Sequence, residues 1–400
     1  MPIPHSELGY YTCNHKIFSS KIEACIYATK HKSPIKWVFN DAVFDSYPWH
    51  IEPEESLDEL YDKRAREIRE KYDYVVLAFS GGGDSNNVLE SFLRQNLLID
   101  EIVVNVMDDY NNTTVIDPNV LSNWNEGAEY TLQTLPRLRY VQSVSPRTKI
   151  SVIDLSKQVF DFLSGFGDEN WLSYTRERLN VSGLMRHNFL HFKEIRKQFD
   201  KSKSVAMVLG IEKPRTYIKG NMFKMMFSDK AVNIATVSEF IEDYTNTGIE
   251  YFYWHPSCAK MIAKQAHIIK RFVELTPKYR GAWKPDNLGD LFKKHRTIQE
   301  RVLRPLLYST WRNTYWQSDK STLDWYSEID NWFTEGHKNS KEFAIWQAGL
   351  KYVQENAKDF IVADDNNQIG LRGFMKAYDI GEVHYVDQPN IETLSLPILP

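Results

Sequence analysis

A glycine-rich segment between a predicted strand and a predicted helix constrains this chain most. The apolar run at 74–79 is typical of a buried strand, and the spacing of apolar residues over 88–93 predicts a helix. Between them lies Ser-Gly-Gly-Gly-Asp-Ser at 80–85. Glycines let the backbone approach a ligand closely, and a helix N-terminus offers free N–H groups and partial positive charge. The segment therefore predicts a binding site for an anion.

Three well-known loop motifs do not fit this segment. The Walker phosphate loop needs a lysine directly after its last glycine, and the segment has none. The dinucleotide fingerprint needs a third glycine at position 86, which is Asn86. The nucleophile elbow needs Gly-x-Ser-x-Gly, and Asn87 stands where its last glycine belongs.

The segment resembles the pyrophosphate loop, Ser-Gly-Gly-x-Asp-Ser, of the N-type ATP pyrophosphatases, with Gly83 in the variable position. This superfamily includes the synthetase domains of asparagine, argininosuccinate, GMP and NAD synthetases, lysidine synthase, tRNA thiolases and PAPS reductases. Its members transfer AMP from ATP to a substrate oxygen, release pyrophosphate, and let a nucleophile displace the AMP. The resemblance implies ATP and Mg²⁺ as cofactors, and the asparagine synthetase domain is the closest in character.

The resemblance also implies a role for each residue of the loop. Asp84 would hold Mg²⁺, because a carboxylate beside bound phosphates repels them unless a cation lies between. Oriented donors and a metal make pyrophosphate a better leaving group by neutralising its developing charge. The residues implied to hold the pyrophosphate are Ser80, Gly81, Gly82, Gly83 and Ser85.

Strands and helices alternate after this loop. The alternation predicts an α/β fold with a doubly wound parallel sheet, of the adenine nucleotide α-hydrolase type. A helix over 124–135 is expected to end at Pro136, and another helix is expected over 186–199. Further strands are predicted over 101–107, 149–155 and 204–209.

We divide the chain into three parts. Residues 1–70 form a small N-terminal α+β segment, residues 71–240 the ATP-pyrophosphatase α/β domain, and residues 241–400 a mainly helical C-terminal region. This last region is expected to pack on the α/β domain as a lid or substrate wall. Its helices are predicted over 259–273, 290–303, 324–335 and 341–356.

The ends of two further strands carry candidate site residues, because ligands of open α/β sheets sit beyond the carboxyl ends of the strands. Asp108 follows the second strand, and Gly210, Lys213 and Arg215 follow the fourth. Family synthetases use a lysine late in the sheet to stabilise pyrophosphate, and Lys213 is our candidate, with Arg215 assisting. As a strand-end side chain, Lys213 is expected to lie outside the core. Asp229 is a further candidate for metal or a substrate amine.

Composition limits the partners and the compartment. The net charge of −4 gives no support to a general nucleic-acid binder, although a local basic face is compatible with it. No apolar run approaches the ~18 residues of a membrane span, and the first residues lack the pattern of a signal peptide. The three cysteines lie far apart in sequence. We therefore expect a soluble, cytoplasmic protein with no membrane partner.

The leading functional hypothesis is an AMP-forming ligase in which Asp84, Lys213 and Arg215 are catalytic. ATP would adenylate a carboxylate or amide oxygen of a small-molecule acceptor, and an amine donor would then attack. Two alternatives stay open: modification of a nucleobase acceptor in nucleic acid, as in lysidine synthase, and a nucleotide-binding protein without turnover. Neither the acceptor, the nucleophile nor the oligomeric state follows from the sequence.

Overall fold

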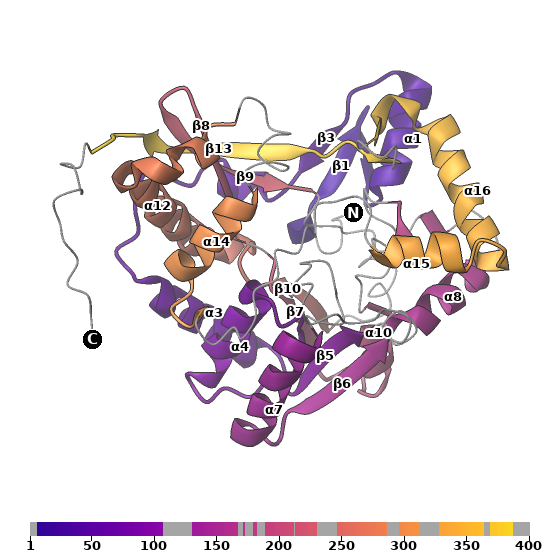
Figure 1. Cartoon of the computed structure of the whole chain (residues 1–400), viewed down its shortest axis with the longest axis horizontal. Coiled ribbons are helices and arrows are strands. Elements are labelled where there is room, and N and C mark those ends of the chain that lie inside the picture. The colour runs from indigo at the N-terminus through magenta and orange to yellow at the C-terminus, as the bar shows by residue number, and fades with distance from the viewer. Residues whose placement is uncertain are drawn as a thin grey trace.

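A five-stranded parallel sheet forms the centre of the α/β fold, at the bottom of Figure 1. The computed structural model describes residues 6–106, 130–166, 171–172, 179–181, 189–211, 213–229, 246–285, 296–311, 328–363 and 369–386. The strands are β4 (Tyr74–Ala78), β5 (Glu101–Val106), β6 (Lys149–Asp154), β7 (Val205–Leu209) and β10 (Thr247–Tyr251). The sequence predicted the first four; β10 begins beyond residue 240, where we ended the α/β domain.

The order of the strands in the sheet is β10-β7-β4-β5-β6. The chain moves from β4 through β5 to one edge at β6, and then returns to β7 on the other side of β4. In the parallel pairing of β4 with β7, Ala78 lies opposite Leu209. The segments that follow these two strands therefore leave the sheet side by side, at the point where the direction of progress along the sheet reverses.

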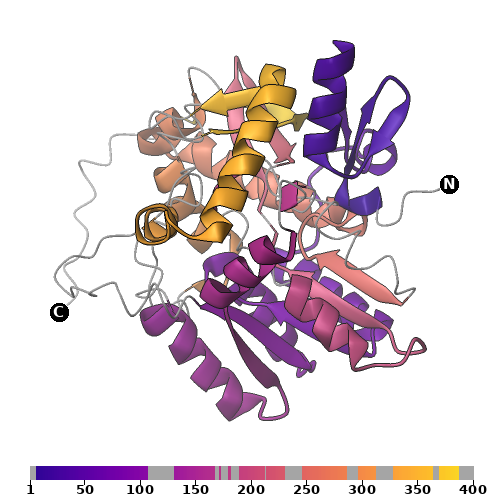
Figure 2. The ribbon, with the colours of Figure 1, turned by 90° about the vertical axis from the view of Figure 1, so that its right-hand side faces the viewer.

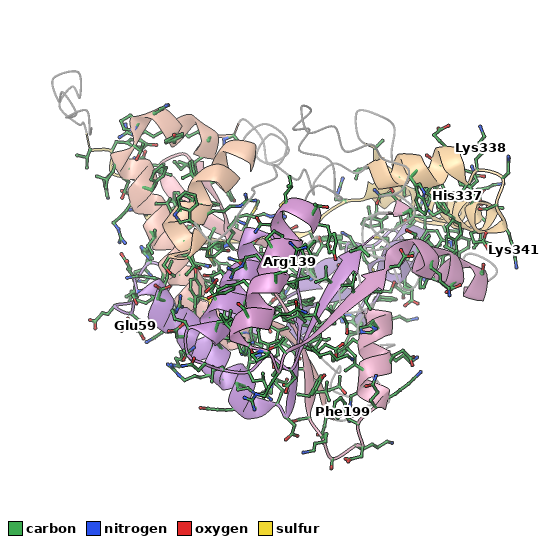
Figure 3. All side chains as sticks on the ribbon, turned by 60° about the horizontal axis from the view of Figure 1, so that its bottom comes forward. Glu59, Arg139, Phe199, His337, Lys338 and Lys341 are labelled. Atoms are coloured by element: carbon green, nitrogen blue, oxygen red, sulfur yellow. The ribbon has the colours of Figure 1, made fainter. Side chains whose placement is uncertain are left out.

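Helices link and cover these strands. The ion pair between Arg137 and Glu90 joins α7 to α4 in the interior. On α10, Arg196 Nε donates a hydrogen bond of 2.9 Å to Thr247 Oγ1 at the start of β10. Figure 3 shows Phe199, which follows α10, at the lower end of the sheet, and Arg139 on α7. The helices are α3 (Leu57–Lys71), α4 (Gly83–Leu93), α7 (Leu135–Val144), α8 (Leu155–Phe166) and α10 (Phe189–Lys197).

Pro136 begins a helix instead of ending one, so the sequence prediction for this residue is wrong. A π-helical turn, Tyr130–Thr134, leads into α7, and Pro136 lies in the first turn of α7. The change from π-helical to α-helical spacing falls just before Pro136, and proline is tolerated in the first turn of an α-helix. The part of the predicted helix before residue 130 lies outside the described residues.

The N-terminal segment contains helices and a small antiparallel sheet, in the order β2-β1-β3. Ser20 caps α1, since its hydroxyl accepts a hydrogen bond of 3.4 Å from the Glu23 N–H. The elements are η1 (Ser6–Leu8), β1 (Tyr10–Cys13), β2 (Lys16–Phe18), α1 (Lys21–His31), β3 (Lys36–Val38) and α2 (Asp41–Phe44).

The C-terminal region contributes strands as well as the predicted helices. β13 (Met375–Glu382), along the top of Figure 1, pairs antiparallel with β9 (Met222–Ser228), which pairs in turn with β8 (Arg215–Lys219). A second pair joins β11 (Ile361–Ala363) and β12 (Ile369–Leu371). The sheet of β13, β9 and β8 thus combines residues from both sides of our boundary at residue 240.

The C-terminal helices divide between two cores. Helices α12 and α14 share the main core with the parallel sheet, whereas α15 and α16 pack with α1 and α8 in a second core. Figure 2 shows α16 beside α1 and above α8, and in Figure 3 the labelled His337, Lys338 and Lys341 lie at the outer end of this second core. The elements are η4 (Pro256–Cys258), α12 (Ala259–Leu275), η5 (Pro277–Trp283), α14 (Arg296–Leu307), α15 (Glu328–Gly336), α16 (Lys341–Asn356) and η7 (Lys358–Phe360).

A buried carboxylate, Glu250, ties β10 to α3. Its side chain is 2 % exposed and accepts bonds from Arg64 at 2.5 Å, Tyr72 at 2.6 Å and Lys71 at 2.8 Å. Burial raises the pKa of Glu250, but the charge of Arg64 and the hydrogen bonds from Lys71 and Tyr72 outweigh it and lower the pKa to about 2. Glu250 therefore stays ionised inside the fold.

None of the helices described here has both the length and the apolar character that crossing a membrane requires.

Candidate anion-binding site

The loop after β4 has a backbone that requires glycine at one position. Gly81 has a φ of +76°, and a Cβ added there would lie 2.5 Å from Thr134 Oγ1. Both the left-handed backbone and the close side chain exclude other residues. Gly82 has an ordinary φ of −67° and is the N-cap residue of α4.

Two side chains from the π-helical turn before α7 hold the carbonyl groups of this loop. Gln133 Nε2 donates a hydrogen bond of 2.7 Å to the Gly81 carbonyl, and Thr134 Oγ1 donates one of 2.9 Å to the Ser80 carbonyl. Gln133 and Thr134 are themselves buried. They fix the loop against the turn that leads into α7.

The N–H groups at the start of α4 are the donors of the site. The first intrahelical bond runs from the Asn86 N–H to the Gly82 carbonyl at 2.9 Å. The N–H groups of 83–85 precede it, and N–H groups in the first turn of a helix have no intrahelical acceptor. Together with the partial positive charge of the helix end, they favour an anion.

The two serines of the loop lie next to each other. Ser80 Oγ and Ser85 Oγ are 3.3 Å apart, and Ser85 Oγ also donates a hydrogen bond of 3.2 Å to the Gly82 carbonyl. The structure therefore brings together both hydroxyls that the sequence assigned to the loop.

Asp84 and Lys213 form an ion pair across the ends of β4 and β7. Lys213 Nζ lies 3.1 Å from each carboxylate oxygen of Asp84. The side chain of Asp84 is 31 % exposed, whereas that of Lys213 is 5 % exposed. Our expectation that Lys213 lies outside the core is thus wrong: the lysine is buried beside the end of the sheet, with Asp84 as a counter-charge.

Gly210 allows this pair to form. A Cβ added at Gly210 would lie 3.0 Å from the Ser85 nitrogen and 3.2 Å from the Asp84 carbonyl carbon. The end of β7 therefore touches the first turn of α4 through backbone atoms alone. This contact carries the following residues, including Lys213, to the loop.

Two tyrosines support Asp84, and the sequence analysis identified neither. The Tyr253 hydroxyl donates a hydrogen bond of 2.9 Å to the Asp84 carbonyl and accepts one of 3.0 Å from Asn87 Nδ2. The Tyr308 hydroxyl donates to the Asp84 carboxylate. Burial, and then the charge of Asp84, raise the pKa of Tyr308 well above its usual value, so this hydroxyl keeps its proton.

An arginine that the sequence analysis also missed lies over the loop. Arg304, near the end of α14, places its side chain against Gly83: a Cβ added at Gly83 would lie 3.4 Å from Arg304 Cδ and from Nε. Arg304 and Tyr308 are four residues apart, a spacing that predicts a shared helical face. Nothing in the sequence indicates that this face meets the loop.

Three predicted site residues are not among those that the structure shows at the loop. Asp108 lies outside the described residues. Arg215 is the first residue of β8 and pairs with Met226 in the antiparallel sheet. Asp229 is fully buried: its carboxylate lies 2.7 Å from Lys21 Nζ and accepts bonds from Tyr11 at 2.9 Å and the Phe374 N–H at 2.8 Å.

Of the two predicted metal ligands, Asp84 suits a metal ion and Asp229 does not. Mg²⁺ is commonly held by one or two carboxylates together with substrate phosphates, and the partly exposed Asp84 beside the loop fits that pattern. Asp229 does not fit, because its side chain is fully buried and lies against Lys21. Among the described residues, no three His, Cys, Asp or Glu side chains gather in a way that could hold a metal.

No protein-family model matches the chain, and no curated protein shows significant similarity to it in sequence. The loop and the side chains around it are therefore the features from which a function can be proposed.

Proposed function

We propose that this chain is an ATP-dependent, AMP-forming ligase of the N-type ATP pyrophosphatase kind, closest in character to the asparagine synthetase domain. The observation that carries the proposal is the Asp84–Lys213 pair, which joins a Ser-Gly-Gly-Gly-Asp-Ser loop to the end of the neighbouring strand. A carboxylate and a cation beside free helix N–H groups suit a phosphate chain that binds with a metal ion.

The strand order supports the same proposal. We propose that the sheet is doubly wound and of the adenine nucleotide α-hydrolase type. In such sheets ligands bind beyond the carboxyl ends of the strands, where the strand order reverses. Here that position lies between β4 and β7, and the loop and Lys213 follow those two strands.

In the proposed reaction an acceptor oxygen attacks the α-phosphorus of ATP. The bond to the oxygen bridging the α- and β-phosphates breaks, and pyrophosphate leaves with the electron pair. An amine then attacks the adenylated carbon, and AMP leaves. Each step needs the charge on its leaving group to be stabilised by donors that are already in place.

The residues of the loop would divide this work. The N–H groups of 83–85 and the hydroxyls of Ser80 and Ser85 would donate to phosphate oxygens. Lys213 would stabilise the charge that develops on pyrophosphate. Asp84 would hold Mg²⁺, which neutralises phosphate charge when it is bound. The proposal gives no metal role to Asp229.

The nature of the products tests the proposal. The protein is incubated with ATP, Mg²⁺ and carboxylate acceptors, with hydroxylamine as the nucleophile because it traps adenylated carboxylates as stable hydroxamates. Phosphorus NMR should show AMP and pyrophosphate in equal amounts, and their formation should require the acceptor. Asp84→Asn serves as the control with impaired metal binding.

Other results would redirect or contradict the proposal. ADP and phosphate as products would contradict an AMP-forming ligase. Tight ATP binding without turnover for any acceptor would favour the nucleotide-binding protein without activity. Stimulation of AMP release by tRNA, with no effect of small carboxylates, would favour a nucleobase as the acceptor.

A further inference from the structure

The last turn of α14 faces the loop after β4. The side chain of Arg304 crosses Gly83, the first residue of α4, with its Cδ and Nε 3.4 Å from the position of a Cβ added there. Arg304 Nε therefore lies close to the helix end that offers N–H groups to an anion. Arg304 is partly exposed.

Packing that does not involve Arg304 holds α14 in this place. Leu303 and Leu307 are 3 % and 1 % exposed and belong to the main core. The Tyr61 hydroxyl donates a hydrogen bond of 3.0 Å to the Leu307 carbonyl, and Gln299 Nε2 donates one of 2.7 Å to the Ala282 carbonyl. The position of α14 is therefore fixed by its apolar face and these bonds.

Tyr308 provides a second contact between this segment and the loop. Its N–H donates to the Arg304 carbonyl at 3.0 Å, so the helical spacing continues and both side chains lie on one face. Because the Tyr308 hydroxyl donates to Asp84, this face meets the loop at two consecutive residues, Gly83 and Asp84.

Binding of pyrophosphate requires more positive charge than Lys213 and the helix end supply, and Arg304 is a cation beside the loop. Lys213 is matched by Asp84, so this pair has no net charge. A pyrophosphate group carries several negative charges, and the partial charge of one helix end together with one Mg²⁺ ion would not balance all of them. A guanidinium group binds phosphate through two parallel N–H bonds and keeps its charge at any ordinary pH.

We infer that Arg304 is a second cationic residue of the site, which binds the pyrophosphate portion of a nucleoside triphosphate. The inference rests on the proposed function and deepens it. It also gives α14, from the C-terminal region, a direct part in binding the substrate.

Calorimetry on the full chain tests the inference with inorganic pyrophosphate and Mg·ATP as probes. Arg304→Met retains most of the apolar stem and removes the charge, and Arg304→Lys retains a charge without the planar fork. Arg271→Met is the matched control, because Arg271 is an exposed arginine on α12 that pairs with Glu52. Thermal unfolding of each variant reports whether the fold is intact.

Arg304→Met should weaken pyrophosphate binding by about 10- to 100-fold, the range of a charged hydrogen bond. Arg304→Lys should restore part of the affinity. The decrease of affinity with rising NaCl should be shallower for Arg304→Met, since fewer charges face the ligand. The melting temperature should stay near that of the wild type, and Arg271→Met should bind like the wild type.

Two results would contradict the inference about Arg304 without contradicting the proposed function. One is Arg304→Met binding pyrophosphate within twofold of the wild type. The other is a loss of affinity that accompanies a lowered melting temperature, does not recover in Arg304→Lys and leaves the salt dependence unchanged. That result would show that Arg304 has only a structural role. A wild-type protein that binds neither probe would instead contradict the proposed function itself, and the inference with it.

Discussion

Lys213 Nζ lies at the same distance, 3.1 Å, from both carboxylate oxygens of Asp84. The two residues follow neighbouring strands of the sheet, and the sequence had suggested them separately, one for a metal and one for pyrophosphate. In the structure each is a counter-charge of the other. Under the proposed function, Asp84 would bind the metal ion and Lys213 would bind the phosphate chain. The ion pair therefore keeps both side chains beside the loop.

The two members of this pair should differ in their effect on stability. Asp84→Asn removes the negative charge that faces Lys213, a cation whose side chain is only 5 % exposed. Lys213→Met leaves Asp84, which is 31 % exposed and can be solvated. We expect Asp84→Asn to lower the free energy of unfolding by about 1–3 kcal/mol and Lys213→Met by less than about 1 kcal/mol.

Urea unfolding monitored by circular dichroism measures both values. The double variant, Asp84→Asn with Lys213→Met, should recover part of the loss, because it removes the buried charge together with its partner. Equal losses for the two single variants would mean that the burial of Lys213 has no energetic consequence.

Lys213→Met should also separate turnover from binding. Lys213 would act on charge that develops as the bond between the α- and β-phosphates breaks, so its loss affects the transition state more than bound ATP. We expect kcat to fall by on the order of 10²-fold or more, with a smaller change in the KM for ATP. Steady-state kinetics of AMP release measures both constants. Turnover at the wild-type rate would show that Lys213 has only a structural role.

Gly81 and Gly82 should respond differently to the same substitution. Gly81→Ala forces a side chain into a backbone with φ of +76° and within 2.5 Å of Thr134 Oγ1. It should lower the free energy of unfolding by roughly 1–3 kcal/mol and weaken ATP binding.

Gly82→Ala is the matched control for that experiment. Gly82 has an ordinary φ, and the nearest atom to an added Cβ is Ser80 Oγ at 3.4 Å. This variant should unfold within about 0.5 kcal/mol of the wild type. Any effect it has on pyrophosphate binding would then come from the added methyl group near the ligand. Similar destabilisation by both substitutions would contradict the loop conformation described here.

The buried Glu250 should make stability depend on pH in the acid range. Its pKa is about 2 in the fold against an ordinary value of 4.5, because Arg64, Lys71 and Tyr72 outweigh burial. The folded state therefore binds the proton less readily than the unfolded state. The resulting stabilisation, roughly 3 kcal/mol, is complete above pH ~4.5 and is lost as the pH falls toward 2.

Glu250→Gln tests this dependence. The variant should be less stable than the wild type at pH 7, and the difference between the two proteins should shrink as the pH falls from about 4.5. Denaturant unfolding at several pH values between 7 and 3 measures it. A difference that stays constant over this range would mean that the charge of Glu250 does not stabilise the fold.

The sequence by itself determined the parts of this protein that depend on neighbouring residues. The buried run at 74–79 and the helical spacing after 85 were enough to identify β4, the loop and α4. The other predicted strands of the parallel sheet follow from short apolar runs in the same way, and β7 is one of them. Asp84 and Lys213 were also identified as candidate site residues from their positions after strands, because parallel strands end at one edge of a sheet, but their ion pair was not predicted.

Only the tertiary structure decided which distant residues complete the site. Arg304, Tyr308 and Tyr253 lie far along the chain from the loop, and their contacts with it depend on how α14 and the end of β10 pack. The local sequence is compatible with Pro136 either ending a helix or lying in its first turn. The structure has the second arrangement, in which Thr134, two residues earlier, bonds to the loop. The burial of Lys213 likewise depends on the fold of the chain after β7. Local sequence fixes backbone preference, whereas contacts between distant segments depend on the burial of apolar surface over the whole chain.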